Sequence, residues 1–300
     1  MRKCEPEPTP KCDLHIHSSF SDGIFAPEVL CEMAVAAGLS HVALCDHDTT
    51  DGILPMQRAA DSLNQAQPSK PLHFLPGIEV SAGAHGNIHV LGYGAHPDKA
   101  EICRYSQDAR RRRLERFSGM VARLAELGVE IPEEQLAPLR DISSVGRAHL
   151  ARMLVRLRIV KTVDAAFQRF LNEGRPAYLP YDHLSATEAV AFLRRAGCVP
   201  ILAHPVRLPM SMEGRFALIR ALQEEGLMGI EVFHPSASRR DVQALERFAG
   251  RSGLLISGGS DFHGDLNKRS HIGFFPGEWT QEAMDALLSA IDTSVISMSL

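Results

Sequence analysis

Fourteen histidines stand in this 300-residue sequence, and many lie beside aspartate or glutamate instead of on a regular apolar face. Two of them, His15 and His17, alternate with Asp13, so in a strand the three side chains would point to the same side. Two imidazoles at this spacing can share one divalent metal ion. The pair alone is weak evidence, because a chain this rich in histidine produces such spacing by chance.

Further acidic and imidazole side chains lie on or just after the other predicted strands. They are Asp46, His47, Asp48, Glu79, His89, His204, Asp261 and His263. In an α/β barrel the carboxyl ends of the strands form one face, so separate segments would bring these groups to one place. Without a metal ion or mutual pairing, so many buried ionisable groups would be too costly. The sequence therefore predicts a metal centre.

Strands and helices alternate in the elements that must position these residues. Strands are predicted over 11–18, 41–48 and 73–82, with helices over 27–37 and up to about residue 66. A further strand, 87–95, follows after only four residues, too few for a parallel crossover, which predicts an antiparallel hairpin. With its turn near Ala84, Glu79 and His89 would face each other across the two strands.

Between residues 99 and 181 the pattern changes to successive amphipathic helices. They are predicted over 99–128, 143–160 and 162–173. We interpret 99–181 as a helical insertion that covers the mouth of the site. The alternation then resumes, with strands over 199–206, 229–233 and 254–264 and helices over 185–196, 213–226, 238–252 and about 280–290. Residues 1–98 and 182–300 are thus expected to form one α/β barrel, irregular because of the hairpin.

Composition and charge exclude several classes of protein. The 32 Lys and Arg against 36 Asp and Glu give a net charge of −4, which offers no general attraction to duplex nucleic acid or anionic membranes. No stretch has the ~18 apolar residues of a membrane span, and the N-terminus lacks an apolar core of a signal peptide. With scattered cysteines and no C-x-x-C pair, we expect reduced thiols and a cytoplasmic protein.

Six motifs, in order, resemble those of the PHP (polymerase and histidinol phosphatase) family. They are DLHIHSSFSDG at 13–23, ALCDHDT at 43–49, PGIEVS at 76–81, IHVLGY at 88–93, LAHP at 202–205 and GSDFHG at 259–264. Further similarity in SSVGRAHLAR, GRPAYLP and EVFHPS indicates the free-standing bacterial branch, associated with nucleoside 3′,5′-bisphosphate phosphatase and 5′-3′ exoribonuclease activity. The resemblance implies a distorted (β/α)7 barrel of PHP type with a helical insertion.

The resemblance also implies two or three divalent ions, Mn²⁺ first, with Zn²⁺, Fe²⁺ or Mg²⁺ as alternatives. One ion is assigned to His15, His17, Glu79 and Asp261, a second to Glu79, His89 and His204, and a third to Asp22, His47 and His263. Asp22 stands where some relatives carry histidine. Its harder oxygen ligand would weaken a preference for zinc or leave the third site partly filled.

A pair of metal ions accounts for phosphoester hydrolysis without a protein nucleophile, because a hydroxide that bridges them can attack the phosphorus. The expected reaction removes the 5′-phosphate of nucleoside 3′,5′-bisphosphates, with 5′ ends of short single-stranded RNA as a second substrate. Asp48, Asp46 and His234 are candidates for serving the leaving oxygen. Each is equally plausible as a hydrogen-bond partner of a ligand.

Arginines near the mouth would bind the phosphates, because a guanidinium grips a phosphate with two hydrogen bonds. The candidates for substrate binding are Arg147, His149, Arg175 and Arg207. The run from Arg110 to Arg113 is instead expected to form a solvated helix face. Tyr178 and Tyr181 could stack on a base or pack in their loop.

Two other functions stay open at this point. A metal-dependent amidohydrolase or deaminase also carries H-x-H on its first barrel strand and a late aspartate, although Asp22, Glu79 and His263 favour the phosphoesterase. A metal-stabilised binding module without catalysis is the other alternative. The intact set of nine ligand candidates argues against it.

Overall fold

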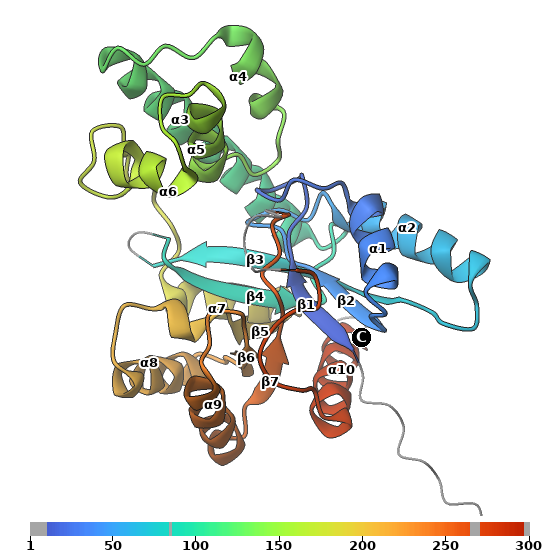
Figure 1. The fold of residues 1–300 in the computed structure, drawn as a ribbon. Helices are drawn as coiled ribbons and strands as arrows, with labels where there is room; N and C mark the ends of the chain where they lie inside the picture. The colour runs from blue at the N-terminus through green and yellow to red at the C-terminus, as the bar shows by residue number, and fades with distance from the viewer. Residues whose placement is uncertain (1–10, 84–85, 265–270, 297–300) are drawn as a thin grey trace, which may run out of the picture.

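Seven strands form one sheet in the computed structural model, which describes residues 11–83, 86–264 and 271–296 (Figure 1). The strands follow each other in chain order: β1 (Cys12–Ile16), β2 (His41–Leu44), β3 (His73–Ala82), β4 (Ile88–Tyr93), β5 (Val199–Leu202), β6 (Gly229–Phe233) and β7 (Leu255–Gly258). Beyond β7, Phe262 bridges to Ile16, and its carbonyl accepts from the His17 amide at 2.9 Å. The sheet therefore curls into a nearly closed barrel, as predicted.

The antiparallel hairpin distorts this barrel. Strand β4 runs antiparallel to both β3 and β5, whereas all other neighbours are parallel. The predicted hairpin is confirmed, but its register was wrong, because His89 pairs with Ser81 and Glu79 pairs with Leu91. A shift of two residues keeps every side chain on its face, so alternation alone cannot distinguish the two registers. The proposed turn residue, Ala84, lies outside the described residues.

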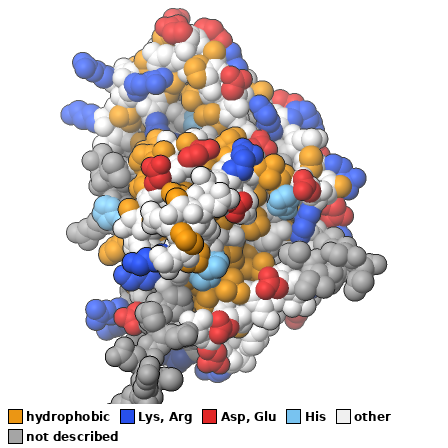
Figure 2. Space-filling model, turned by 90° about the vertical axis from the view of Figure 1, so that its right-hand side faces the viewer, with side chains coloured by type: hydrophobic (Ala, Val, Ile, Leu, Met, Phe, Trp, Pro, Cys, Tyr) orange, Lys and Arg blue, Asp and Glu red, His pale blue; other side chains and the backbone are white. Residues whose placement is uncertain are grey.

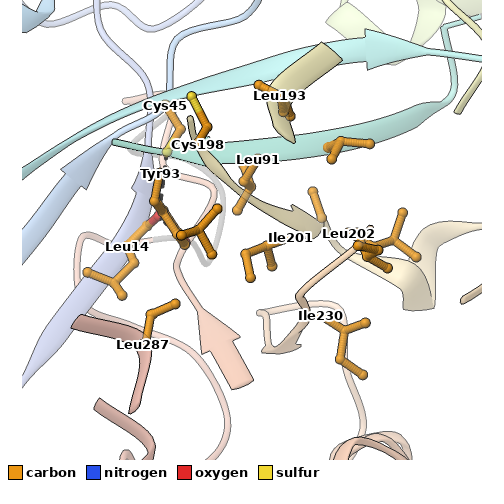
Figure 3. Packing of buried hydrophobic residues seen from close by; sticks show 14 of the residues in the cluster. Leu14, Cys45, Leu91, Tyr93, Leu193, Cys198, Ile201, Leu202, Ile230 and Leu287 are labelled. Atoms are coloured by element: carbon orange, nitrogen blue, oxygen red, sulfur yellow. Dashed lines mark hydrogen bonds between the residues drawn. The ribbon is translucent and has the colours of Figure 1, made fainter. Parts of the chain in front are cut away.

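Helices cover the outside of the barrel. They are α1 (Pro27–Ala36), α2 (Ile53–Ala66), α7 (Ala186–Arg195), α8 (Met212–Glu224), α9 (Arg239–Ser252) and α10 (Gln281–Ile296). Aliphatic side chains such as Leu14, Ile201 and Leu287 fill the space between strands and helices (Figure 3). Within this core, the hydroxyl of Tyr93 on β4 links two other strands. It donates to the Leu14 carbonyl of β1 at 2.9 Å and lies 2.6 Å from Ser257 Oγ of β7.

The helices between β4 and α7 pack around a second core. They are α3 (Ala100–Glu126), α4 (Glu133–Arg140), α5 (Arg147–Arg156), α6 (Val163–Ala166) and a π-helical turn (Phe167–Leu171). Phe117, Leu150 and Phe170 are buried in their shared core. This group stands above β3 and β4, and α3 runs down to the barrel (Figure 1). The sequence did not predict α4, because Pro138 interrupts its pattern; burial of Leu136 holds it in place.

Several strands end earlier than predicted, and the chain turns sharply beyond them. Asp48, His204 and Asp261 follow β2, β5 and β7 with φ angles of 54°, 28° and 51°. Residues other than glycine rarely adopt such φ angles. Those that adopt them are found most often at functional sites. These three predicted site residues consequently sit in tight turns beyond the carboxyl ends of their strands.

On one face of the molecule, charged side chains are not segregated by sign. Figure 2 shows Lys and Arg interspersed with Asp and Glu on one face of the molecule, which matches the net charge of −4. Within the described ranges, no helix combines the length and apolar character needed to cross a membrane. The five cysteines in those ranges, Cys12, Cys31, Cys45, Cys103 and Cys198, are free thiols, as expected.

Candidate metal centre

Glu79 occupies the middle of a buried group of histidines. Its Oε2 lies 3.1 Å from Nδ1 of His47, and 3.3 Å from Nε2 of both His15 and His17. Its Oε1 lies 2.9 Å from Nδ1 of His89 and 3.0 Å from Nε2 of His204. The two oxygens of one carboxylate thus face two different sets of imidazoles, the arrangement that a bridging ligand requires.

Two aspartates extend the group on either side. Asp261 Oδ1 lies 3.2 Å from His17 Nε2 and 3.7 Å from His15 Nε2. Asp22 Oδ1 lies 3.1 Å from His263 Nε2, and 3.9 Å from His47 Nε2. All nine predicted ligand candidates therefore meet at one end of the barrel, although they come from segments far apart in the sequence.

The donor atoms fall into three overlapping groups, each within 4.8 Å. They are His17, Asp22, His47 and His263; His15, His17, Glu79 and Asp261; and His47, Glu79 and His89. Four buried atoms in these groups have no hydrogen-bond partner: His17 Nδ1, Asp22 Oδ1, His47 Nδ1 and Glu79 Oε2. Unpartnered buried polar atoms are costly unless something satisfies them. Mixed imidazole and carboxylate donors suit a divalent transition metal, so these residues fit such an ion.

The carboxylates of the cluster are held in their charged form. Burial disfavours the charge of Glu79, but His47, His89 and His15 outweigh it and hold the pKa of Glu79 well below its usual value. Burial acts the same way on Asp261, and His263 and His17 again bring its pKa well below normal. Cation ligands must be deprotonated, so these two carboxylates are ready to bind metal at neutral pH.

Comparison with known proteins gives a consistent result. The PHP domain model matches residues 13–137. The 3′,5′-nucleoside bisphosphate phosphatase of Chromobacterium violaceum is 34% identical over 254 residues, which cover 84% of this chain and 86% of that protein. The chain belongs to the PHP family.

Two more PHP relatives match most of the chain. The 5′-3′ exoribonuclease of Haemophilus influenzae is 31% identical over 85% of this chain and 90% of its own length. A proposed metal-dependent phosphoesterase from Bifidobacterium adolescentis superimposes with a TM-score of 0.80 at 29% identity, covering 94% of this chain and 97% of its own. With the site geometry, these likenesses make this PHP chain a metal-dependent phosphoesterase.

Buried carboxylates outside the three donor groups hold the loops of this PHP site. Asp13 accepts from Ser260 N at 2.8 Å and Ser260 Oγ at 2.6 Å, which fixes the segment leading to Asp261. Asp46 accepts from Ser18 N at 2.7 Å and Ser18 Oγ at 2.6 Å, just after His17. Neither carboxylate belongs to the donor groups, so both act by fixing loops.

Glu231 supports two histidines at once, and sequence reasoning missed it. Its Oε1 accepts from His15 Nδ1 at 2.9 Å, and its Oε2 accepts from the His204 backbone amide at 2.6 Å. The hydrogen bond from His15 Nδ1 to Glu231 orients the imidazole so that Nε2 faces Glu79. The sequence GIEV, shared by residues 77–80 and 229–232, was the one available signal.

Glu231→Gln is expected to weaken metal binding by about 10- to 100-fold, the usual cost of losing a hydrogen bond that orients a ligand. A glutamine amide can accept one of the two hydrogen bonds but presents an NH₂ group to the other donor. Calorimetric titration of metal-depleted protein with Mn²⁺ measures the effect. Glu224→Gln, on the exposed surface of α8, is the control. Equal affinities in the two variants would contradict the assigned role.

The predicted proton-transfer residues lie in different surroundings. His234 is buried, its Nδ1 accepts from Ser236 N at 3.0 Å, and its Nε2 lies 3.5 Å from Asp261 Oδ2. Asp48 is buried and paired instead: it accepts from Tyr105 Oη at 2.5 Å and Arg113 Nε at 2.9 Å. Burial opposes its charge, yet Arg113 and Tyr105 lower the pKa of Asp48 to about 2.

The predicted substrate-binding residues are dispersed. Arg207 is exposed, and its Nη1 donates to Asp261 Oδ2 at 2.9 Å, so it lies beside the metal cluster. Arg147 begins α5, near the ring of Tyr178. His149 Nδ1 accepts from Gly146 N at 3.1 Å and caps α5, and burial lowers its pKa to about 4. Arg175 is exposed in its loop.

The prediction that Arg110 to Arg113 form a solvated face was wrong for Arg113. Arg110 and Arg111 are exposed, but Arg113 reaches down to Asp48 and also donates to Ser81 Oγ at 3.0 Å. Four consecutive helical residues are spread around the whole helix, so one of them necessarily faces the barrel on which α3 rests.

Proposed function

We propose that this PHP phosphoesterase hydrolyses a phosphate monoester of nucleoside 3′,5′-bisphosphates, with 5′ ends of short RNA as related substrates. The observation that carries the proposal is the position of Glu79, whose two oxygens face two sets of histidines. A group of arginines outside that cluster supplies the second requirement, a site for another phosphate. The names of the two relatives described above support the same substrate class.

The nine residues predicted as ligands are proposed to hold two or three divalent ions, Mn²⁺ first. Glu79 would bridge two of them, and Asp22, with His47 and His263, would hold the third, with His17 Nδ1 also nearby. Such ions supply activation of water and neutralisation of the phosphoryl charge. Glu231, Asp13 and Asp46 would hold the ligands and their loops in place.

His234 is proposed as the proton donor to the leaving oxygen. Because its Nδ1 accepts the Ser236 amide, its proton lies on Nε2, directed toward Asp261 at the edge of the cluster. Asp48 does not fit the donor role, since its carboxylate already accepts hydrogen bonds from Tyr105, Arg113 and the Ser81 amide. We therefore assign Asp48 to positioning.

A second phosphate is proposed to bind between α3 and α5. Arg116 and Arg147 lie 5.4 Å and 5.9 Å from the centroid of the Tyr178 ring, so the two guanidiniums are near neighbours. Burial and the charge of Arg147 lower the pKa of Arg116 to about 10, and Nη2 of Arg116 is buried without a hydrogen-bond partner among the described residues. Ser144, three positions before Arg147, is a buried residue whose hydroxyl also has no hydrogen-bond partner. A phosphate bound between the two guanidiniums would satisfy their charge.

The helices of the predicted insertion, 99–181, are proposed to cover the barrel mouth. Arg152 of α5 donates to the backbone carbonyl of Asp22, and Ser144 N donates to the Phe20 carbonyl at 3.0 Å. Both contacts fall on the loop that carries Asp22. The proposed phosphate site therefore adjoins the metal cluster. Arg207, in the segment after β5, donates to Asp261 of the metal cluster. From there it could contact the phosphate held by the metals.

A screen with Mn²⁺ that follows phosphate and ammonia release tests this function. We expect phosphate release, with adenosine 3′,5′-bisphosphate preferred over AMP by roughly 10- to 100-fold in kcat/KM, because a second charge-assisted contact adds about 1.5–3 kcal/mol. Ammonia release would support the amidohydrolase, and binding without turnover would support the non-catalytic module.

The product identifies the phosphate that leaves. The sequence-based expectation, loss of the 5′-phosphate, predicts adenosine 3′-phosphate as the product. Chromatography of the nucleotide left after one turnover distinguishes it from 5′-AMP. Formation of 5′-AMP would reverse the assignment of the two phosphates to their sites, while a preference for AMP as substrate would overturn the two-phosphate proposal itself.

A further inference from the structure

We propose that Arg113 is a positioning residue that fixes the second-phosphate site of the insertion relative to the metal-bearing strands. Substrates with two phosphates should therefore depend on Arg113, whereas simple phosphate esters should not. The inference rests on the proposed function, because it assumes that Arg116 and Arg147 bind a phosphate. Nothing in the motifs of the sequence pointed to this arginine.

Arg113 joins α3 to the barrel through a buried ion pair. Its Nε donates to Asp48 Oδ2 at 2.9 Å, its Nη2 contacts the same oxygen, and its Nη2 also donates to Ser81 Oγ at 3.0 Å. The side chain of Arg113 is 14% exposed and that of Asp48 only 1%. About two turns earlier on α3, Tyr105 donates to Asp48 Oδ1 at 2.5 Å. The helix is thus attached to Asp48 at two points.

On the barrel side, the two partners of Arg113 adjoin proposed metal ligands. Asp48 follows His47 directly, and its amide donates to the Glu79 carbonyl at 2.9 Å. Ser81 lies two residues after Glu79, and its amide donates to Asp48 Oδ1 at 2.8 Å. The guanidinium therefore contacts the turn after β2 beside His47, and the end of β3 beside Glu79.

On the insertion side, Arg113 lies beside both arginines of the proposed phosphate site. Arg116 follows three residues later on α3, a spacing that places two side chains next to each other on a helix. A Cβ placed on Gly146 would lie 3.1 Å from Arg113 Nη1, so the guanidinium packs against the residue before Arg147. One planar group thus contacts the metal-bearing strands and the segment that begins α5.

The shape of the guanidinium explains why lysine could not replace it. Nε and Nη2 reach Asp48, Nη2 also reaches Ser81, and Nη1 faces Gly146. A lysine ammonium is a single point charge and cannot make these contacts from one position. The distance between the metal centre and the second-phosphate site is therefore set by the arginine fork.

The test compares Arg113→Lys and Arg113→Met with the wild type on two substrates, adenosine 3′,5′-bisphosphate and p-nitrophenyl phosphate. For each variant, kcat/KM for the bisphosphate should fall at least about tenfold, because misplacing one phosphate contact forfeits most of its contribution. For p-nitrophenyl phosphate, kcat/KM should stay within about twofold of the wild-type value, and the number of bound metal ions should not change. Arg111→Met, which removes an exposed arginine paired with Asp108, is the matched control.

Equal losses on both substrates, or no loss on either, would overturn the assignment. Ser81→Ala removes one contact of Arg113 without breaking the ion pair, so it serves if the arginine variants do not fold. It should lower the bisphosphate to p-nitrophenyl phosphate ratio about two- to fivefold, the usual effect of one hydrogen bond. An unchanged ratio in Ser81→Ala would count against the proposal.

Hydrogen exchange separates failure of this inference from failure of the proposed function. Arg113→Met should speed amide exchange in the first half of α3 and around Ser81, and leave exchange in β6 unchanged. If the wild type does not prefer the bisphosphate, the two-phosphate proposal fails, yet faster exchange would still support Arg113 as the docking residue. Unchanged exchange would overturn that docking role.

Discussion

Replacing Glu79 with alanine should lower kcat by at least two to three orders of magnitude, since the loss disturbs both water activation and charge stabilisation at the phosphoryl group. The side chain is fully buried, and its two oxygens face histidines from β1, β4 and the turns after β2 and β5. Among the residues that the structure describes, no other carboxylate faces the same two sets of imidazoles with its two oxygens.

Elemental analysis of protein prepared with excess Mn²⁺ accompanies the kinetics. Glu79→Ala should hold fewer ions than the wild type, for which we expect at least two per chain. Circular dichroism must show that the variant folds, and Glu224→Ala provides the matched surface control. A folded Glu79→Ala variant with near-normal kcat would rule out the metal mechanism.

The metal ligands could be predicted because their positions follow from the fold class. Histidine and acidic residues at the ends of strands converge in any barrel of parallel strands, so the sequence placed His204 and Asp261 together although 57 residues separate them. The same reasoning did not require knowledge of the hairpin register. His89 stays on the face of Glu79 whether it pairs with Glu79 or with Ser81.

Which of the buried carboxylates only support the site could not be decided in this way. Asp13 shares a strand face with His15 and His17, yet it binds Ser260 and Gly273 and takes no part in the donor groups. Asp46 and Glu231 likewise accept only hydrogen bonds from loop residues or ligands. Whether a buried carboxylate faces a cation or an amide depends on backbone turns that the pattern of residue types does not encode.

The positively charged site was also beyond prediction from sequence, for a different reason. Arg113 and Arg116 lie on a helix of 27 residues with many exposed arginines, and only the docking of that helix decides which of them are buried. Two of the predicted phosphate contacts illustrate the limit. Arg147 lies with Arg116 against the ring of Tyr178, whereas Arg175 is exposed in its loop.

The double variant Arg116→Met, Arg147→Met should lower kcat/KM for adenosine 3′,5′-bisphosphate by about 10- to 100-fold, and so remove the whole preference over AMP, because charge-assisted contact to the second phosphate contributes about 1.5–3 kcal/mol. Each single variant should lower it by about three- to tenfold. The effects should not add fully if both guanidiniums bind one phosphate. Methionine keeps much of the apolar stem, so packing against Tyr178 is largely preserved.

Activity on p-nitrophenyl phosphate identifies the cause of that loss, because this ester carries a single phosphate and needs the metal centre alone. It should change by less than about threefold in the double variant, and Arg175→Met should behave like the wild type on both substrates. Raising the salt concentration should weaken bisphosphate turnover in the wild type more than in the double variant, since screening acts on the charges removed. Equal losses on the two esters would instead show that Arg116 and Arg147 support the metal centre, and the second phosphate would then have to bind elsewhere.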